Sequence, residues 1–179
     1  MSERSGCVTQ WILAAMLVSA GGAVLPAGAQ SPAPGRENAT SEADTAFAAL
    51  QERGKRAMGV DQYTSVHHFI DTPEGGRIVF ERDSSDSIGV AAIQLHLKHL
   101  ASAFSAGDFQ LPGMVHAQKV PGTAVMATKH TAIQYDFRSL AGGGEVRIRT
   151  QDAEALRAVH AFLGFQRREH RVQHDTHRH

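Results

Sequence analysis

The chain has 179 residues, of which 42% are hydrophobic and 20% are charged, which is enough for one sizeable core and short for two. Lysine plus arginine (18) balance aspartate plus glutamate (18), so the positive charge excess typical of a nucleic-acid-binding protein is absent. We therefore expect one globular domain with terminal tails and no nucleic-acid partner.

Residues 1–29 have the pattern of a secretory signal peptide cleaved near Ala29. They combine an early Arg4, an apolar run and a small-residue ending. The run, Trp11–Val18, is followed by Ser19 and glycines, and it is shorter than the ~20 apolar residues that span a bilayer. The sequence predicts a periplasmic or secreted bacterial protein with no stable membrane span after cleavage; a retained anchor is the alternative.

Cys7 is the only cysteine of the chain, and it precedes the predicted cleavage point. The mature protein would then contain no disulfide, no thiolate metal ligand and no cysteine nucleophile. Its stability has to come from the hydrophobic core.

In chain order, residues 30–40 (QSPAPGRENAT) predict a disordered spacer because they are rich in proline, serine and other polar residues. Ser41-x-x-Asp44 is a weak capping box, and it predicts a helix that ends at Gly59. The range 41–169 reads as a single domain with an internal duplication, in which residues 64–106 and 131–169 each form a hairpin followed by a helix.

Strand alternation predicts the core face of each hairpin. The alignment of the two halves matches Thr64 with Thr131, so His68 takes the place of Tyr135 and is expected in the core with Val66 and Ile70. Thr123–Lys129 reads as a fifth strand, and helices are expected over 87–106 and 153–168. The predicted fold class is α+β, with an antiparallel sheet made of the two hairpin-helix repeats, helices packed on one face and an additional N-terminal helix.

Eleven histidines are the strongest departure from average composition. Several arrangements suggest metal binding, and each has a structural alternative. The end of the chain, 170–179, is either a chelating tail or a solvated helix end. His96 and His99 are one helical turn apart, so they either share a metal or form a core-edge and an exposed residue. His67 and His68 are consecutive in a strand, so their rings point to opposite faces.

The candidate metal ligands are His67, His96, His99, His116, His130, His170, His174 and His177. Copper or zinc is the expected ion, since neutral imidazole binds both and no thiolate is present. Met114-x-His116, with Met58 and Met126, would suit Cu(I); methionines that fill core gaps are the alternative.

A second functional hypothesis is a small-molecule-binding domain or small enzyme with a histidine and aspartate acid–base pocket. Asp61, His67 or His68, and His116 would line it between the sheet and the crossover 107–122. The chain has no phosphate-binding loop of the G-x-x-x-x-G-K type, no G-x-S-x-G elbow and no H-E-x-x-H helix. No nucleophile is predicted beside these groups.

Several short motifs resemble a group of small exported bacterial proteins that have no assigned function. They are Met58-Gly59-Val60-Asp61-Gln62, Thr64, His67-His68-Phe69, Gly107-Asp108-Phe109 and Gly144-Glu-Val-Arg-Ile-Arg-Thr150. The resemblance covers roughly residues 50–170. Some of those proteins carry the label aspartate carbamoyltransferase, which implies a two-domain enzyme with a Ser-Thr-Arg-Thr carbamoyl-phosphate loop. This chain has neither the length nor the loop, so the activity is not carried over.

Overall fold

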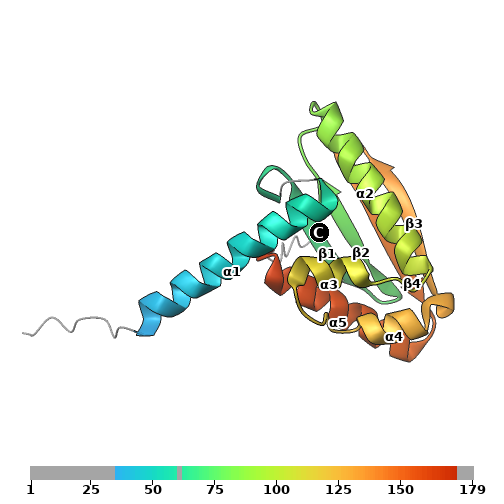
Figure 1. Ribbon diagram of the computed structural model, residues 1–179. Coiled ribbons are helices and arrows are strands. Elements are labelled where there is room, and N and C mark those ends of the chain that lie inside the picture. The colour runs from blue at the N-terminus through green and yellow to red at the C-terminus, as the bar shows by residue number, and fades with distance from the viewer. Residues whose placement is uncertain (1–34, 60–61, 173–179) are drawn as a thin grey trace, which may run out of the picture. The chain divides into compact units, whose positions relative to one another are not determined.

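The computed structural model describes residues 35–59 and 62–172, and it has the predicted α+β fold. One antiparallel sheet has the strand order β1-β2-β4-β3 (Figure 1). Its strands are β1 (Val66–Thr72), β2 (Gly75–Glu81), β3 (Ile133–Leu140) and β4 (Gly143–Thr150). The helices are α1 (Gly35–Met58), α2 (Ser87–Ser105), α3 (Gln110–His116), α4 (Thr123–Thr128) and α5 (Ala153–Glu169), with short 3-10 turns η1 (Gln62–Thr64) and η2 (His130–Ala132).

The order strand, strand, helix occurs twice, as β1-β2-α2 and β3-β4-α5. Each half of the predicted duplication was expected to form a hairpin followed by a helix. That the two halves arose by duplication stays a prediction. The predicted signal peptide at 1–29, Asp61, His174 and His177 lie outside the described residues.

The first helix starts earlier than expected. It begins at Gly35 rather than at Ser41, so residues 35–40 are helical and do not belong to a disordered spacer. Pro34 is the last proline of the polar segment, and Arg36, Glu37 and Ala39 after it all favour helix. The proline content that predicted the spacer therefore stops just before the helix.

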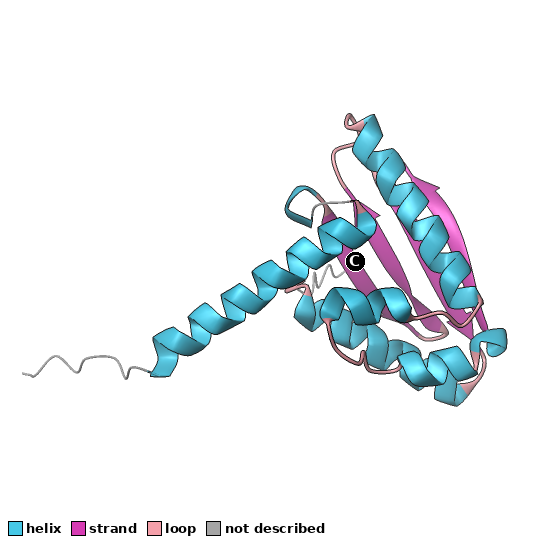
Figure 2. Ribbon diagram, in the orientation of Figure 1, coloured by secondary structure: helices cyan, strands magenta, loops and turns pink. Residues whose placement is uncertain are grey.

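The core lies between the sheet and the helices on one of its faces (Figure 2). Helix α2 contacts β3 and β4, and α5 contacts β1, β2 and β4. The sheet contributes Phe69, Ile78, Phe80, Ile133, Tyr135, Val146 and Ile148, and the two helices contribute Ile93, Leu97, Leu100, Phe104, Ala155, Val159, Phe162 and Leu163. Among the described helices, none is long and apolar enough to cross a membrane.

The predicted core face of β1 was wrong. Val66 and Ile70 are 55% and 38% exposed, whereas His67 and Phe69 are 2% and 4% exposed. His67 pairs with Phe80 and Phe69 with Ile78 across the sheet, which places both on the helix side. The sequence alignment matched His68 with Tyr135, one residue away from a match between the buried positions of the two strands. A slip of one residue moves every side chain of a strand to the other face.

The predicted fifth strand, Thr123–Lys129, was also wrong, because the segment forms α4. The segment contains β-branched residues, but Met126 N–H donates to the carbonyl of Gly122 (3.0 Å), and the Met126 side chain is fully buried. Tertiary burial of one side chain thus decides against the local strand propensity.

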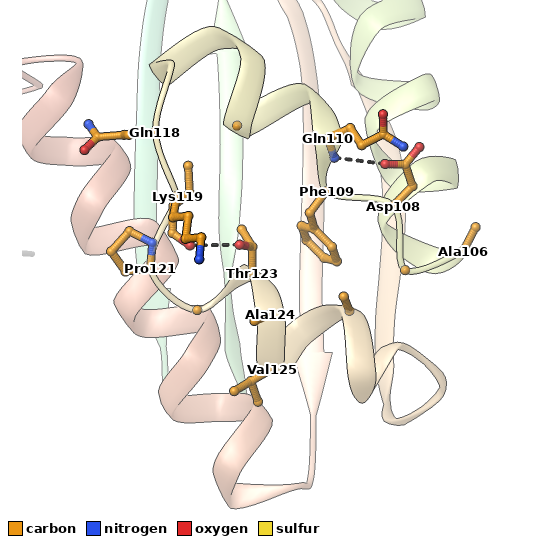
Figure 3. A pocket seen from close by; sticks show the side chains of 15 residues that line it. Ala106, Asp108, Phe109, Gln110, Gln118, Lys119, Pro121, Thr123, Ala124 and Val125 are labelled. Atoms are coloured by element: carbon orange, nitrogen blue, oxygen red, sulfur yellow. Dashed lines mark hydrogen bonds between the residues drawn. The ribbon is translucent and has the colours of Figure 1, made fainter.

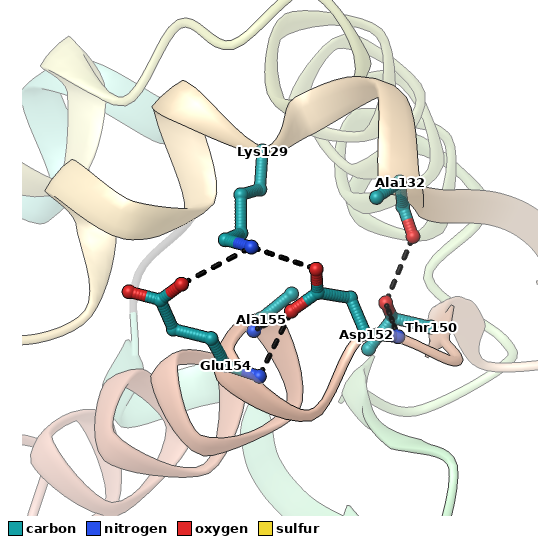
Figure 4. Close-up of polar contacts among 6 residues, drawn as sticks. All are labelled: Lys129, Ala132, Thr150, Asp152, Glu154 and Ala155. Atoms are coloured by element: carbon teal, nitrogen blue, oxygen red, sulfur yellow. Dashed lines mark hydrogen bonds and ion pairs between the residues drawn. The ribbon is translucent and has the colours of Figure 1, made fainter.

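Helix α5 begins at a well-defined cap that also connects it to α4. The Asp152 carboxylate accepts hydrogen bonds from the backbone N–H groups of Glu154 (2.8 Å) and Ala155 (2.9 Å) (Figure 4). Lys129 Nζ lies 2.7 Å from Asp152 and 3.1 Å from Glu154. The lysine and these backbone donors lower the pKa of Asp152 to about 2, so the cap stays ionised.

Gly122, the residue before α4, lies against the backbone of α5, and its substitution tests that contact. Its φ is +83°, and a Cβ at this position would overlap the carbonyl oxygen of Ala158. We expect Gly122→Ala to lower the free energy of unfolding by about 2 kcal/mol, measured by urea denaturation. Gly113→Ala in α3, where the nearest atom is 3.9 Å away, should change it by at most ~1 kcal/mol. Equal effects of the two substitutions would contradict this packing.

Candidate functional site

Three buried histidines from separate parts of the chain meet beside the core, and we call them the histidine cluster. His67 lies on β1, His116 is the last residue of α3, and His170 caps the C-terminus of α5. They are 2%, 5% and 6% exposed. The ring centroid of His170 lies 5.8 Å from that of His67 and 5.2 Å from that of His116.

His67 is held by its neighbours across the sheet. It packs on Phe80 with ring centroids 3.8 Å apart and an interplanar angle of 14°. Its Nε2 lies 3.0 Å from the hydroxyl of Ser65. Its Nδ1 is buried and has no hydrogen-bond partner, so one of its two ring nitrogens is unpaired.

His116 is held from α5. Its Nε2–H donates to the side-chain oxygen of Gln166 (2.9 Å), and the ring packs edge-on against Phe165. In the neutral ring, Nδ1 therefore carries the lone pair, and this atom is buried without a hydrogen bond. The nearest carboxylate oxygen, on Glu169, is 3.8 Å from it.

Burial keeps the cluster uncharged. Burial, together with a smaller effect of nearby histidines, lowers the pKa of His67 and of His170 to about 3. Burial also lowers the pKa of His116, although Gln166 and Glu169 act in the opposite direction. At neutral pH all three rings are neutral, which is the form that binds metal ions.

His96 and His99 do not act as a pair. His96 is 8% exposed and lies parallel to Phe80, with ring centroids 6.1 Å apart, and burial lowers its pKa to about 4. His99 is exposed, so the two are a core-edge and a solvent-facing residue. His96, His116, Gln166 and His170 line a small, mostly apolar cavity of about 50 Å³.

His130 and His160 serve the fold. His130 Nδ1–H donates to the carbonyl of Ser105 (2.9 Å) at the end of α2. His160 Nε2–H lies 3.0 Å and 2.9 Å from the carbonyls of Thr72 and Gly75, which flank the β1–β2 turn. Carbonyl oxygens only accept, so these ring nitrogens are protonated donors and cannot bind a metal.

The methionine hypothesis does not fit the structure. Met114 is 61% exposed, whereas His116, two residues on, is buried. Met126 is fully enclosed in the core, and the side chain of Met58 lies outside the described residues. Met114 therefore does not join His116 at the cluster.

One member of the predicted acid–base pocket, Asp61, lies outside the described residues. His116 lines the small cavity between the sheet and the crossover, whereas His67 and His68 do not. A hollow of about 1030 Å³, open to solvent, is formed by the crossover itself and by the start of α4 (Figure 3). None of its lining residues is a histidine. Asp108 accepts from Gln110 N–H (2.9 Å) and the Thr123 hydroxyl donates to the carbonyl of Val120 (2.8 Å), so these groups stabilise the loops.

The sequence analysis put His170 in the wrong element and did not include Gln166 among the candidate residues. The sequence assigned His170 to the terminal tail, but α5 continues to Glu169 and His170 is buried against its last turn. Val172 also packs against the core. Gln166 precedes His170 by one helical turn on the same face, which is the signal that could have linked them.

As the rings are oriented, no three histidine, cysteine or carboxylate side chains within the described part of the chain are grouped to hold one metal ion. The ring positions are nevertheless close to those required. Two imidazoles that share an ion with metal–nitrogen bonds of ~2 Å have centroids ~5 Å apart, and the cluster has 5.2 Å and 5.8 Å.

In comparisons with known proteins, no family model matches the chain, and no curated protein or solved structure matches it. The functional argument therefore depends on the geometry of the cluster.

Proposed function

We propose that this protein is an exported binding domain that takes up one transition-metal ion at the histidine cluster. A single observation carries the proposal. Three imidazoles from β1, α3 and the end of α5 converge in a buried region, and the Nδ1 atoms of His67 and His116 have no hydrogen-bond partner there.

The unpartnered nitrogens distinguish the cluster from a structural use of histidine. A buried polar atom without a partner costs roughly 1–3 kcal/mol. His130 and His160 each donate from one ring nitrogen to a backbone carbonyl, and their other nitrogen is not among the buried atoms without a partner. In His67 and His116 one nitrogen is held and the other is left open, which is the usual state of a metal-binding histidine whose second nitrogen is fixed by a neighbour.

The size of the cavity favours an ion over an organic ligand. Pockets for small molecules usually have volumes of about 300–1,000 Å³. The cavity beside His116 and His170 has about 50 Å³, which accommodates an ion or a water molecule but no metabolite. The small-molecule hypothesis therefore has less support than metal uptake.

Metal titration of matched variants tests this function. We expect the chain truncated after Val172 to bind one Cu or Zn ion in calorimetry, because all three histidines of the cluster precede the truncation. His116→Leu and His170→Phe should each weaken this binding by about 100-fold or more, since they remove a ligand. His99→Ala, at an exposed position of α2, is the control and should leave it unchanged.

Two outcomes would contradict the proposal. One is metal binding that disappears when residues 173–179 are removed, because the tail would then be the segment that binds the metal. The other is full affinity in the double variant His116→Leu/His170→Phe.

A further inference from the structure

We propose that two copies of this protein associate through their β3 strands. The two strands pair edge to edge and antiparallel, with Phe137 opposite Phe137, so that the sheets of both copies form one continuous sheet. The pairing does not depend on metal uptake. Strand β3 forms one edge of the sheet, and β1, which carries His67, forms the other edge (Figure 1). The histidine cluster of each copy therefore lies outside the interface.

Strand β3 presents unpaired backbone groups at its free edge. Successive residues of an antiparallel strand direct their N–H and C=O groups alternately to its two sides. Thr150 N–H donates to the carbonyl of Glu74, on the β2 side of β4 (2.9 Å), so Thr150 does not bond to its β3 partner, Ile133. From Ile133 onward, every second residue of β3 thus points its backbone groups away from β4. These residues include Tyr135, Phe137 and Ser139.

The opposite edge of the sheet is closed to such pairing. Arg167 of α5 reaches β1, where its Nη1 donates to the carbonyl of Phe69 (2.8 Å) and its Nη2 lies 2.7 Å from Asp71. This guanidinium occupies an acceptor that an added strand would need. Along β3, the described residues make one such contact, from Gln94 to the carbonyl of Leu140 at the end of the strand (3.3 Å). The middle of β3 is left as an open edge without a proline or a bulge, which is a template for another strand.

Two charged residues of β3 select the register. Asp136 and Arg138 are exposed, and they alternate with the core-facing residues of the strand, so both lie on the sheet face away from the helices. With Phe137 opposite Phe137, each Asp136 faces the Arg138 of the second copy, and both pairs attract. A slide of two residues in one direction sets Asp136 opposite Asp136, and a slide in the other direction sets Arg138 opposite Arg138. Both alternatives repel, so one register is favoured.

Both charged groups have hydrogen-bonding capacity left for this contact. Arg138 makes no hydrogen bond or ion pair with the residues that the structure describes. The carboxylate opposite it in β4, Glu145, pairs with Arg77 instead (3.2 Å). Asp136 accepts from Arg149 through Oδ2 (2.6 Å), which leaves Oδ1 for a second donor.

The helix side of the junction is also suited to a second copy. Phe137 is half-buried, with Lys98 Nζ of α2 5.2 Å from its ring centroid, and the pairing brings two such rings together. Helix α2 packs over both β3 and β4. Since neighbouring strands are ~4.8 Å apart, the two α2 helices would lie ~10 Å apart, near the usual spacing of packed helices. Ala91 and Leu95, which are exposed, share the helix face of Lys98 and offer small and apolar contacts there.

Sedimentation velocity tests the association, on protein purified after expression of the full chain. The concentration is varied from about 1 to about 200 µM, a range that includes the dissociation constants of small interfaces. We expect wild-type protein to sediment with twice the mass of one chain at the upper end of this range.

Two charge variants and their mixture test the register. Asp136→Arg gives an edge with two positive charges, and Arg138→Asp gives one with two negative charges. Each homodimer then contains two repulsive pairs, and its dissociation constant should rise by ~10-fold or more. In an equimolar mixture, opposite charges face each other again, so a dimer of the two variants should form about as tightly as the wild-type dimer. This recovery also shows that both variants are folded.

Ser139→Pro tests the backbone pairing without a change of charge. The N–H of Ser139 points away from β4, so proline removes a donor that the dimer uses and the single copy does not. We expect the dimer to be weakened by ~10-fold or more, with the circular dichroism spectrum unchanged. The control is Val66→Arg, which adds a charge at an exposed position of β1, and it should leave the dimer unchanged.

Four results would overturn the proposal. They are a wild-type chain that stays monomeric at the highest concentration, a dimer that neither the charge variants nor Ser139→Pro weakens, a mixture of the two charge variants that does not associate, and a dimer that Val66→Arg disrupts. Because β3 and the histidine cluster lie at opposite edges of the sheet, each of these results leaves metal uptake standing.

Discussion

Lowering the pH from 7 to 5 is expected to reduce the free energy of unfolding by several kcal/mol. Burial lowers the pKa of His67 and His170 to about 3 and that of His96 to about 4. Below the ordinary histidine pKa of ~6.5 the unfolded chain takes up protons that the folded chain excludes, so stability is full above that pH and falls as pH decreases toward the folded values.

The size of the effect is comparable with the whole stability of a small domain. A pH of 5 is ~1.5 units below the pKa of these histidines in the unfolded chain. Each of them therefore lowers the free energy of unfolding by about 2 kcal/mol at that pH. His67 and His170 repel each other when both are charged, so their contributions are not simply additive. A domain of this size is stable by ~5–15 kcal/mol, and we expect it to unfold between pH ~4 and ~5.

Urea denaturation at several pH values measures this dependence. His96→Leu should remove part of the acid sensitivity, because the leucine stays neutral in the same buried position. His99→Leu and His68→Tyr are the controls; His99 is exposed and His68 is half-buried on the other face of the sheet. The sequence had placed His68 in the core. A stability that stays constant from pH 7 to pH 5 would show that the buried rings do not control it.

Phe104→Ala is expected to lower the free energy of unfolding by about 3–5 kcal/mol. The ring is 1% exposed, and its centroid lies 4.4 Å from Phe109, 5.7 Å from Tyr135 and 5.8 Å from Phe162. The alanine would leave a cavity between α2, the sheet and α5. The chain's only cysteine is Cys7, so no disulfide within the chain offsets the loss.

The matched control for this prediction is Ile88→Ala in the same helix. Ile88 is 84% exposed, and its truncation should change the free energy of unfolding by no more than ~0.5 kcal/mol. Similar values for the two variants in urea denaturation would contradict the core described here.

The sequence predicted the fold class because its signals were strong and local. The helices over 87–106 and 153–168 have apolar faces of helical period, and both begin at an aspartate that caps them, Asp86 and Asp152. The hairpins alternate with period two. In β1, however, apolar Val66 and Ile70 are exposed, and the buried alternates are His67 and Phe69. A polar residue on the core face reverses the pattern that the prediction depends on.

The candidate site was only partly predictable for a related reason. His67, His116 and His170 each stood among the possible ligands, but so did His99 and His130. Their grouping depends on where α3 ends and on how far α5 continues past Arg167, and neither follows from hydrophobic period. Ala117, with φ of 53°, ends α3 so that His116 faces α5. Long-range placement of this kind is visible only in three dimensions.

The most direct test of the central claim is a crystal structure of the chain truncated after Val172 and loaded with Cu(I) under anaerobic conditions. We predict one anomalous scattering peak per chain in the histidine cluster, with ring nitrogens of His116 and His170 within about 2.0–2.3 Å of it. A fully loaded crystal whose peaks all lie at surface positions such as His99, with the cluster rings unchanged, would contradict metal uptake at this site.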